Sequence, residues 1–210
     1  MIATIALHER SLDEAGKAVH AALGVTPGFV EAMTNLGFVA QARGRWEDAR
    51  SWYDRAAALD PGFPRGNKLS GDLWFEKGDY RRALVNYREV LHARPNDFAA
   101  LIQAGTCQRR LGHAAGAERL FERARKARPD SWVPVYDLAC LKAALGRPDE
   151  ALELLVAELP GKDFDEPELL ASDPDLAEVR RLPRFPELVR AAGRPQDRPA
   201  AVSPPAAAPR

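Results

Sequence analysis

The sequence predicts an all-α protein built as a solenoid of antiparallel helix pairs, because three residue types recur along it every 34 residues. Internal periods of roughly 20–50 residues are typical of stacked repeat architectures. The recurring prolines are Pro27, Pro61, Pro95 and Pro129, the glycines are Gly44, Gly78, Gly112 and Gly146, and the alanines are Ala15, Ala49, Ala83, Ala117 and Ala151.

Small and large side chains alternate in register with this period. A small residue precedes each alanine on the expected first helix of a pair, as Gly71 precedes Ala83, and lets the two helices approach closely. A larger side chain follows each alanine by four residues: Val19, Tyr53, Tyr87, Phe121 and Leu155. We expect these large side chains to fill the space between neighbouring repeats.

Glycine and proline mark the expected helix ends. The glycine at the Gly78 position permits the left-handed backbone that ends the first helix of a pair. The recurring proline ends the second helix, since proline lacks the amide donor that a helix interior needs. Ser11-Leu12-Asp13-Glu14 is a capping box before a helix, and Pro148 suits a first helical turn.

These ladders resemble the tetratricopeptide repeat (TPR) family, whose pattern is W-x2-L-G-x2-Y, then A-x3-F, then P. The clearest matches are Leu36-Gly37 with Ala49, Tyr53 and Pro61, and Ser70-Gly71 with Ala83, Tyr87 and Pro95. The first aromatic of the pattern is absent throughout, and the last repeat lacks its proline. The resemblance implies a right-handed superhelical solenoid with a concave groove that binds proteins.

The register divides the chain into repeats. We expect a truncated first repeat at 1–28, four repeats at 29–62, 63–96, 97–130 and 131–163, a helical cap at 164–191, and a disordered Pro/Ala tail at 192–210. Two explanations of the short first repeat stay open. Either Ile2–Glu9 forms a frayed half-helix, or the sequence is a fragment of a longer chain.

The expected cap has both a family resemblance and a physical reason. Four motifs resemble the closing segment of many bacterial TPR arrays: Tyr136-Asp137-Leu138-Ala139-Cys140, Gly146-Arg147-Pro148-Asp149-Glu150, Ser172-Asp173-Pro174-Asp175-Leu176 and Pro183-Arg184-Phe185. An uncovered last repeat would expose an apolar face. The side chains expected to cover it are Phe164, Leu169, Leu170, Leu176, Val179, Leu182, Phe185, Leu188 and Val189.

No pattern in the sequence indicates catalysis or a metal site. The chain lacks a nucleophile elbow, a phosphate-binding loop and a dinucleotide fingerprint. Its four histidines have no metal-ligand spacing, and its two cysteines, Cys107 and Cys140, cannot form a metal site alone. We expect a protein that is not an enzyme and that holds no cofactor and no metal. Cys140 is interpreted as a small buried residue and the four tryptophans as packing residues.

Composition restricts the partners and the compartment. Hydrophobic residues make up 46% of the chain, which suffices for a core, and 30 Lys and Arg balance 30 Asp and Glu. Nucleic-acid binders usually carry a basic excess, so nucleic acid is disfavoured as a partner. The sequence shows no signal peptide and no membrane-spanning stretch, so we expect no membrane partner. If Met1 is the true start, a cytoplasmic location follows.

The resemblance implies that the groove is lined by the first helix of each pair at repeat positions 2, 5, 9 and 12. Thr34 and Cys140 fall on these rows. The candidate groove residues are Asn35, Phe38, Gln41, Arg65, Lys68, Asp72, Phe75, Ile102, Thr106, Arg109 and Tyr136. Arg65 with Lys68 could hold an acidic group, and Phe38 with Phe75 an apolar one. Alternatively, Glu31 with Arg65 and Lys68 with Asp72 merely neutralise each other, and the cap covers the apolar end of the groove around Ile102, Val133 and Tyr136.

Two functions from different classes follow. The first is a non-catalytic adaptor that binds a protein or peptide segment in the groove. The second is a structural piece, either a scaffold that associates with itself as a homo-oligomer or the TPR appendage of a larger enzyme. TPR domains that hold chaperone tails use a Lys and an Asn four residues apart on the first helix. Here Asp72 follows Lys68 at that spacing, so a chaperone-tail receptor is not expected.

Overall fold

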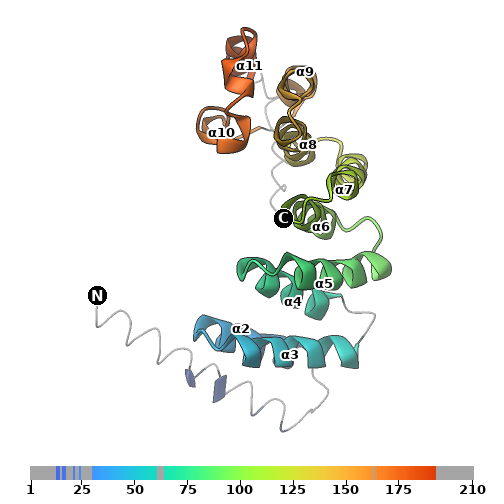
Figure 1. Cartoon of the computed structure of the whole chain (residues 1–210). Coiled ribbons are helices and arrows are strands. Elements are labelled where there is room, and N and C mark those ends of the chain that lie inside the picture. The colour runs from blue at the N-terminus through green and yellow to red at the C-terminus, as the bar shows by residue number, and fades with distance from the viewer. Residues whose placement is uncertain are drawn as a thin grey trace, which may run out of the picture. The chain divides into compact units, whose positions relative to one another are not determined.

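The computed structural model describes residues 13, 14, 16, 17, 21, 24, 30–60, 64–162 and 164–192, and every regular element within this part of the chain is helical (Figure 1). The chain divides into two compact units, Met1–Pro129 and Asp130–Arg210. The all-α fold of stacked helix pairs that the sequence predicts is confirmed.

Three helix pairs stack on one another in the first unit. The helices are α2 (Val30–Ala42), α3 (Trp46–Leu59), α4 (Arg65–Glu76), α5 (Tyr80–Ala93), α6 (Phe98–Arg110) and α7 (Ala114–Ala127). Each pair packs within itself, and α3 contacts α4 as α5 contacts α6. The first helices of the pairs are therefore α2, α4 and α6, which carry ten of the eleven candidate groove residues.

The turn inside each pair is built around a glycine with left-handed backbone, as predicted. The φ angles are 70° at Gly44, 75° at Gly78, 78° at Gly112 and 74° at Gly146. After α4, the Gly78 amide donates to the Phe75 carbonyl and the Asp79 amide to the Trp74 carbonyl. These two bonds form a Schellman motif, which satisfies carbonyls that the helix end leaves open.

The recurring glycine on the first helix makes room for the recurring ring on the second. A Cβ atom added at Gly71 would lie 2.8 Å from Cε1 of Tyr87, and one added at Gly105 would lie 2.5 Å from Cε1 of Phe121. Each of these rings is fully buried. The glycine and the aromatic residue of one repeat therefore form a matched pair, and a larger residue at the glycine would overlap the ring.

The same rings connect neighbouring pairs. Tyr53 of the α2–α3 pair packs with Leu73 of α4, and Tyr87 of the α4–α5 pair packs with Ala104 and Cys107 of α6. The prediction that these rings fill space between repeats is confirmed for Tyr53 and Tyr87. Burial raises the pKa of the Cys107 thiol from 9.0 to about 12, because the thiolate would lose its hydration.

The second unit pairs two helices and covers them with short segments. Its elements are α8 (Val133–Ala144), α9 (Pro148–Glu158), α10 (Glu168–Ser172), α11 (Phe185–Ala192) and the 3-10 turns η1 (Leu159–Gly161), η2 (Pro174–Leu176) and η3 (Val179–Arg181). Leu170, Leu176, Val179 and Leu188 pack into one core with residues of α8 and α9. These residues form the helical cap that the sequence predicts.

Two expected features at the ends of the chain differ from the structure, and others fall outside the described residues. Val189, expected in the cap core, is 45% exposed, because it lies on the outer side of α11. Ala192, the first residue of the expected tail, is still helical, and residues 193–210 lie outside the described residues. Most of the expected first repeat, including Ile2–Glu9 and the start of the capping box, also lies outside them.

Candidate partner-binding site

Hydrogen bonds within one repeat fix the polar residues of α4. Nζ of Lys68 donates to Oδ2 of Asp72 at 2.7 Å, and the Tyr87 hydroxyl donates to Oδ1 of Asp72 at 2.8 Å. Burial, and then the Asp72 charge and hydrogen bond, raise the pKa of Tyr87. Asp72 therefore serves mainly to orient Lys68 and the buried Tyr87.

Gln41 has a similar bridging position one repeat earlier. Its Oε1 accepts a hydrogen bond from the Tyr53 hydroxyl at 3.0 Å, and its Nε2 donates to Oε2 of Glu76 at 3.0 Å. Burial, followed by the charges of Glu76 and Asp72, raises the pKa of Tyr53. Gln41 thus links α2, α3 and α4, and its polar atoms are already used within the protein.

Arg65 and Lys68 line a pocket that also holds an arginine the sequence analysis missed. The pocket, of about 270 Å³, is lined by Pro64, Arg65, Lys68, Val90, Arg94 and Asp97. Arg94 follows the last residue of α5, so a search restricted to first helices could not find it. Asp97, the only carboxylate among the described residues of the lining, caps α6 by accepting a hydrogen bond from the Ala100 amide at 3.0 Å.

Two of the three cations in this pocket have no counter-ion. Among the described residues, neither the Arg65 nor the Arg94 side chain makes an ion pair or a hydrogen bond. The expected neutralisation of Arg65 by Glu31 is therefore not found there, whereas that of Lys68 by Asp72 is. Arginine carries its charge at any physiological pH and binds carboxylates through paired N–H groups, so this pocket favours an anionic group.

The two candidate phenylalanines differ in exposure. Phe38 is 42% exposed, and its ring meets the edge of Tyr53 with the centroids 5.9 Å apart. Phe75 is half-buried and meets the edge of Tyr80 at 5.5 Å. Both rings keep an accessible part while a neighbouring ring fixes their orientation. Asn35 is exposed on the same helix as Phe38.

The candidates on α6 are less accessible. Ile102, Thr106 and Arg109 are all half-buried. The Thr106 hydroxyl donates to the Ile102 carbonyl at 3.0 Å, so it is occupied within its own helix. The exposed part of Ile102 extends the apolar surface of the first helices.

Two expected groove positions are buried. Thr34 is 0% exposed, and its hydroxyl donates to the Glu31 carbonyl at 2.9 Å. Tyr136 is 6% exposed, and its hydroxyl donates to Oδ2 of Asp173 at 2.9 Å. The open groove rows therefore do not include Thr34 or Tyr136, because neighbouring residues cover them. For Tyr136 those residues include the cap residues Phe164 and Leu169, as the alternative interpretation stated.

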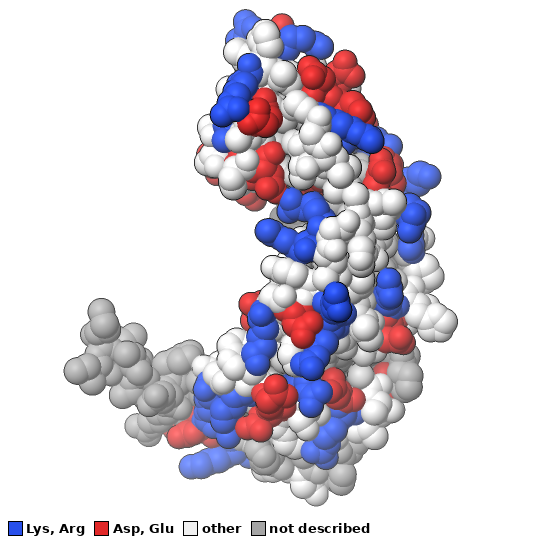
Figure 2. Space-filling view, viewed as in Figure 1, with Lys and Arg blue, Asp and Glu red and all other residues white. Residues whose placement is uncertain are grey.

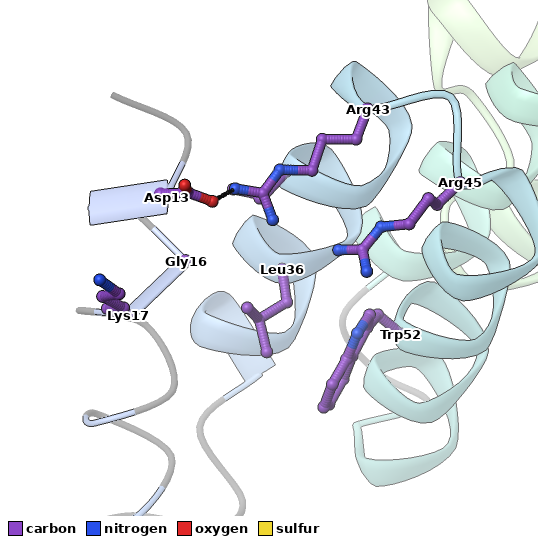
Figure 3. A pocket seen from close by; sticks show the side chains of 8 residues that line it. Asp13, Gly16, Lys17, Leu36, Arg43, Arg45 and Trp52 are labelled. Atoms are coloured by element: carbon purple, nitrogen blue, oxygen red, sulfur yellow. Dashed lines mark hydrogen bonds and ion pairs between the residues drawn. The ribbon is translucent and has the colours of Figure 1, made fainter. Parts of the chain in front are cut away.

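Another cavity lies beside α2, facing away from the candidate rows. Leu36, Val39 and Trp52 supply its apolar lining, in a volume of about 340 Å³ (Figure 3). Figure 3 shows Asp13 directed toward the guanidinium of Arg43, with which it forms an ion pair. Arg43 on the rim of this cavity is thus already paired within the protein.

Charge on the surface is interspersed. Figure 2 shows Lys and Arg side chains alternating with Asp and Glu over the face that it presents, as the balanced composition predicts. The described residues contain no group of three or more His, Cys, Asp or Glu side chains that could hold a metal ion. In the same part of the chain, no helix has the length and apolar character needed to cross a bilayer.

Comparison with family models matches this chain to tetratricopeptide repeats over most of its length. One repeat model matches residues 30–63, and another matches residues 75–131 and 109–172. No curated protein matches the sequence at a significant level. The repeat models leave the N-terminal residues and the end of the chain unmatched.

Solved structures with a similar fold include three informative cases. PilF of Pseudomonas aeruginosa superposes with a TM-score of 0.67 at 17% identity, covering 89% of this chain and 83% of its own. YrrB, a TPR protein with an unusual peptide-binding site, gives 0.63 at 18% identity, covering 85% and 92%. The first TPR of Spaghetti (RPAP3), bound to the HSP90 peptide SRMEEVD, gives 0.52 at 16% identity, covering 56% and 93%. At these identities the likeness concerns the fold.

Proposed function

The chain belongs to the tetratricopeptide repeat family, and from this premise we propose that it is a non-catalytic adaptor that binds a segment of a partner protein. The binding surface is the face of α2, α4 and α6 in the first unit. Arg65, Lys68 and Arg94 receive an acidic group of the segment. Phe38 and Phe75 receive an apolar side chain.

The observation that carries this proposal is the arginine pocket. Lys68 in this pocket is paired with Asp72. Arg65 and Arg94 line one pocket without a counter-ion among the described residues. A partner carboxylate that pairs with two exposed arginines forms charge-assisted hydrogen bonds, which strengthen its binding, and the positive charge raises its association rate. Until the partner binds, the exposed guanidinium groups stay hydrated.

Peptide binding by proteins of similar fold supports the same assignment. YrrB has a peptide-binding site, and the first TPR of RPAP3 is bound to a peptide that contains two glutamates and an aspartate. Stacked first helices present side chains in parallel rows, which suits an extended segment. An acidic partner segment is thus the chemistry that we assign to the pocket.

The test is a selection of linear peptides on the full chain, followed by titration of a selected peptide against variants. We expect Arg65→Ala with Arg94→Ala to weaken binding of the selected peptide by about tenfold. The matched control is Arg81→Ala with Lys126→Ala, which removes the same charge from exposed positions outside the pocket. Circular dichroism establishes that each variant is folded.

Equal binding by the arginine variant and the control would exclude the pocket as the site. The alternative, a self-associating scaffold, then predicts a concentration-dependent increase in mass without any peptide. Sedimentation velocity over a range of concentrations separates that outcome from peptide binding.

A further inference from the structure

A cavity in the first unit opens between the second helices of two neighbouring pairs, whereas the proposed groove lies on the first helices. It has a volume of about 450 Å³. Helices α5 and α7 form its walls, and α6 lies between them in the stack (Figure 1). Its lining consists of Leu84, Arg88, Leu91, His92, Ala104, Gln108, Gly116, Arg119, Leu120 and Arg123.

The base of this cavity is apolar and shaped by a glycine. Leu84 and Ala104 are buried there, at 6% and 0% exposure. The Gln108 side chain lies over Gly116, since a Cβ atom added at Gly116 would lie 3.0 Å from Cδ of Gln108. A 2.9 Å hydrogen bond between Oε1 of Gln108 and Nδ1 of His113 holds the amide in place. The base therefore has a defined shape that suits an aliphatic side chain.

Three arginines give the rim of the cavity its positive charge. Arg88 comes from α5, which also supplies His92, and Arg119 and Arg123 come from α7. None of the described residues in the lining is acidic. Within the described part of the chain, Arg88 and Arg119 make no ion pair or hydrogen bond through their side chains. Arg123 donates to the Pro95 carbonyl at 2.5 Å, which fixes its guanidinium at the rim.

Some cations on the same helices are neutralised locally. Arg82 forms an i,i+3 pair with Asp79 and Arg125 one with Glu122, whereas Arg88 and Arg119 have no counter-ion among the described residues. The chain as a whole has equal numbers of acidic and basic residues. A cluster of unpaired arginines around an apolar base therefore concentrates positive potential at one place on a neutral protein.

We propose that this cavity is a second docking site, specific for an acidic protein segment that places one aliphatic side chain between carboxylates. The aliphatic side chain enters the base, and the carboxylates pair with Arg88 and Arg119. A nucleic acid fits less well, because the lining contains no aromatic side chain on which a base could stack. The protein would then bind two segments, one on the first helices and one on the second helices.

The test uses a fluorescein-labelled peptide, acetyl-Glu-Asp-Leu-Asp-Glu, whose leucine carries a photoreactive diazirine. We expect Arg88→Ala with Arg119→Ala to weaken binding of this peptide by about tenfold. The control pair Arg81→Ala with Lys126→Ala removes the same charge from the same two helices, away from the cavity, and should change binding by less than about twofold. All four side chains are exposed, so folding is preserved.

Cross-linking distinguishes this site from the groove. We expect the photoreactive leucine to attach within residues 84–92 of α5 or 116–123 of α7, and the Arg65→Ala with Arg94→Ala variant to keep these products. Attachment only on α2, α4 or α6 would overturn the second site and leave the proposed groove intact. Equal weakening by the control pair would overturn it as well.

A variant peptide and a competing anion test the chemistry of the segment that binds in this cavity. Replacing the leucine of the peptide by serine should weaken binding, because the apolar base then stays unfilled. Inorganic phosphate should compete poorly at concentrations that match the peptide. Equal binding of the serine peptide, or equal competition by phosphate, would show a simple anion site and contradict docking of a protein segment.

Discussion

At the scale of single residues, the matched glycine and ring of each repeat decide how closely the two helices of a pair approach. The sequence shows that Gly71 and Tyr87 belong to one repeat, and the structure shows that they touch. A protein interior is close-packed, so the ring cannot move aside without disturbing Ala104 and Cys107 behind it.

Gly71→Leu is expected to lower the free energy of unfolding by about 1–3 kcal/mol, because the added side chain overlaps the Tyr87 ring. Denaturant titration followed by circular dichroism measures the change. The control is Ala99→Leu, which adds a similar side chain at an exposed position of α6. An unchanged midpoint for Gly71→Leu would mean that the repeat register is wrong.

The buried Cys107 thiol predicts a dependence of stability on alkaline pH. Its folded-state pKa is raised from 9.0 to about 12, so folding favours the neutral thiol. The resulting stability is fully present below pH 9 and is lost as the pH rises toward 12, because the unfolded chain releases the proton first. We expect unfolding free energies of Cys107→Ala to fall less steeply than those of the wild type across this window.

If the unfolding free energies of the wild type and of Cys107→Ala fall equally steeply with pH, burial of this thiol does not contribute to the pH dependence of stability. Cys107 also helps to raise the pKa of the neighbouring Tyr87, so the difference between the two pH profiles reports the thiol together with its effect on that phenol.

At the scale of the helix, the turn glycines illustrate which features the sequence can predict and which it cannot. The left-handed backbone at the recurring glycines could be predicted, because few other residues adopt it at low cost. The burial of Thr34 and Tyr136 could not be predicted in the same way. A repeat register places a residue on a helix face, but it does not show which other segments cover that face.

The arginine pocket illustrates the same limit. Arg65 and Lys68 could be found from their spacing on one helix, whereas Arg94 reaches the pocket from the end of α5, the second helix of the same pair. Its position beside Arg65 depends on how the two helices of that pair pack against each other. Residues that share a helix are therefore accessible to sequence reasoning, and residues that meet between helices need the structure.

Gly78→Ala is expected to destabilise the protein by about 1–2 kcal/mol through backbone strain alone. Its φ is 75°, and nothing lies within 4 Å of an added Cβ atom, so crowding does not contribute. Asparagine tolerates left-handed backbone better, so Gly78→Asn should cost less than Gly78→Ala. If both substitutions lower the thermal midpoint equally, backbone strain at this position is not the cause of the destabilisation.

At the scale of the whole molecule, the last repeat depends on a cap. Leu170, Leu176, Val179 and Leu188 are at most 1% exposed and pack with residues of α8 and α9. The hydroxyl of Tyr136 is bonded to the carboxylate of Asp173 in the same region. Apolar burial and this buried hydrogen bond both require the segment that follows α9.

Deleting residues 164–210 should destabilise or unfold the second unit, because it uncovers the apolar faces of α8 and α9. Deleting residues 194–210 is the matched control and should leave the thermal midpoint nearly unchanged, since that segment has no aromatic side chain to bury. Equal thermal midpoints for the two truncations would show that the segment after α9 does not stabilise the second unit as a cap.

The proposed function requires that a partner segment binds on the first helices of the stacked pairs. An affinity in the micromolar range, about 8 kcal/mol, is expected for a short segment on such a surface. Apolar contacts depend little on salt, whereas exposed charge pairs weaken as salt screens them. Phe75 and Arg65 represent these two kinds of contact.

The most direct test is titration of a selected partner peptide against Phe75→Ala and Arg65→Ala at low and high ionic strength. We predict that Phe75→Ala weakens binding more than Arg65→Ala at high salt, and that the difference narrows at low salt, where the arginine contributes more. If neither substitution changes the affinity for that peptide at either ionic strength, the first helices are not its binding surface, and the proposed function is wrong.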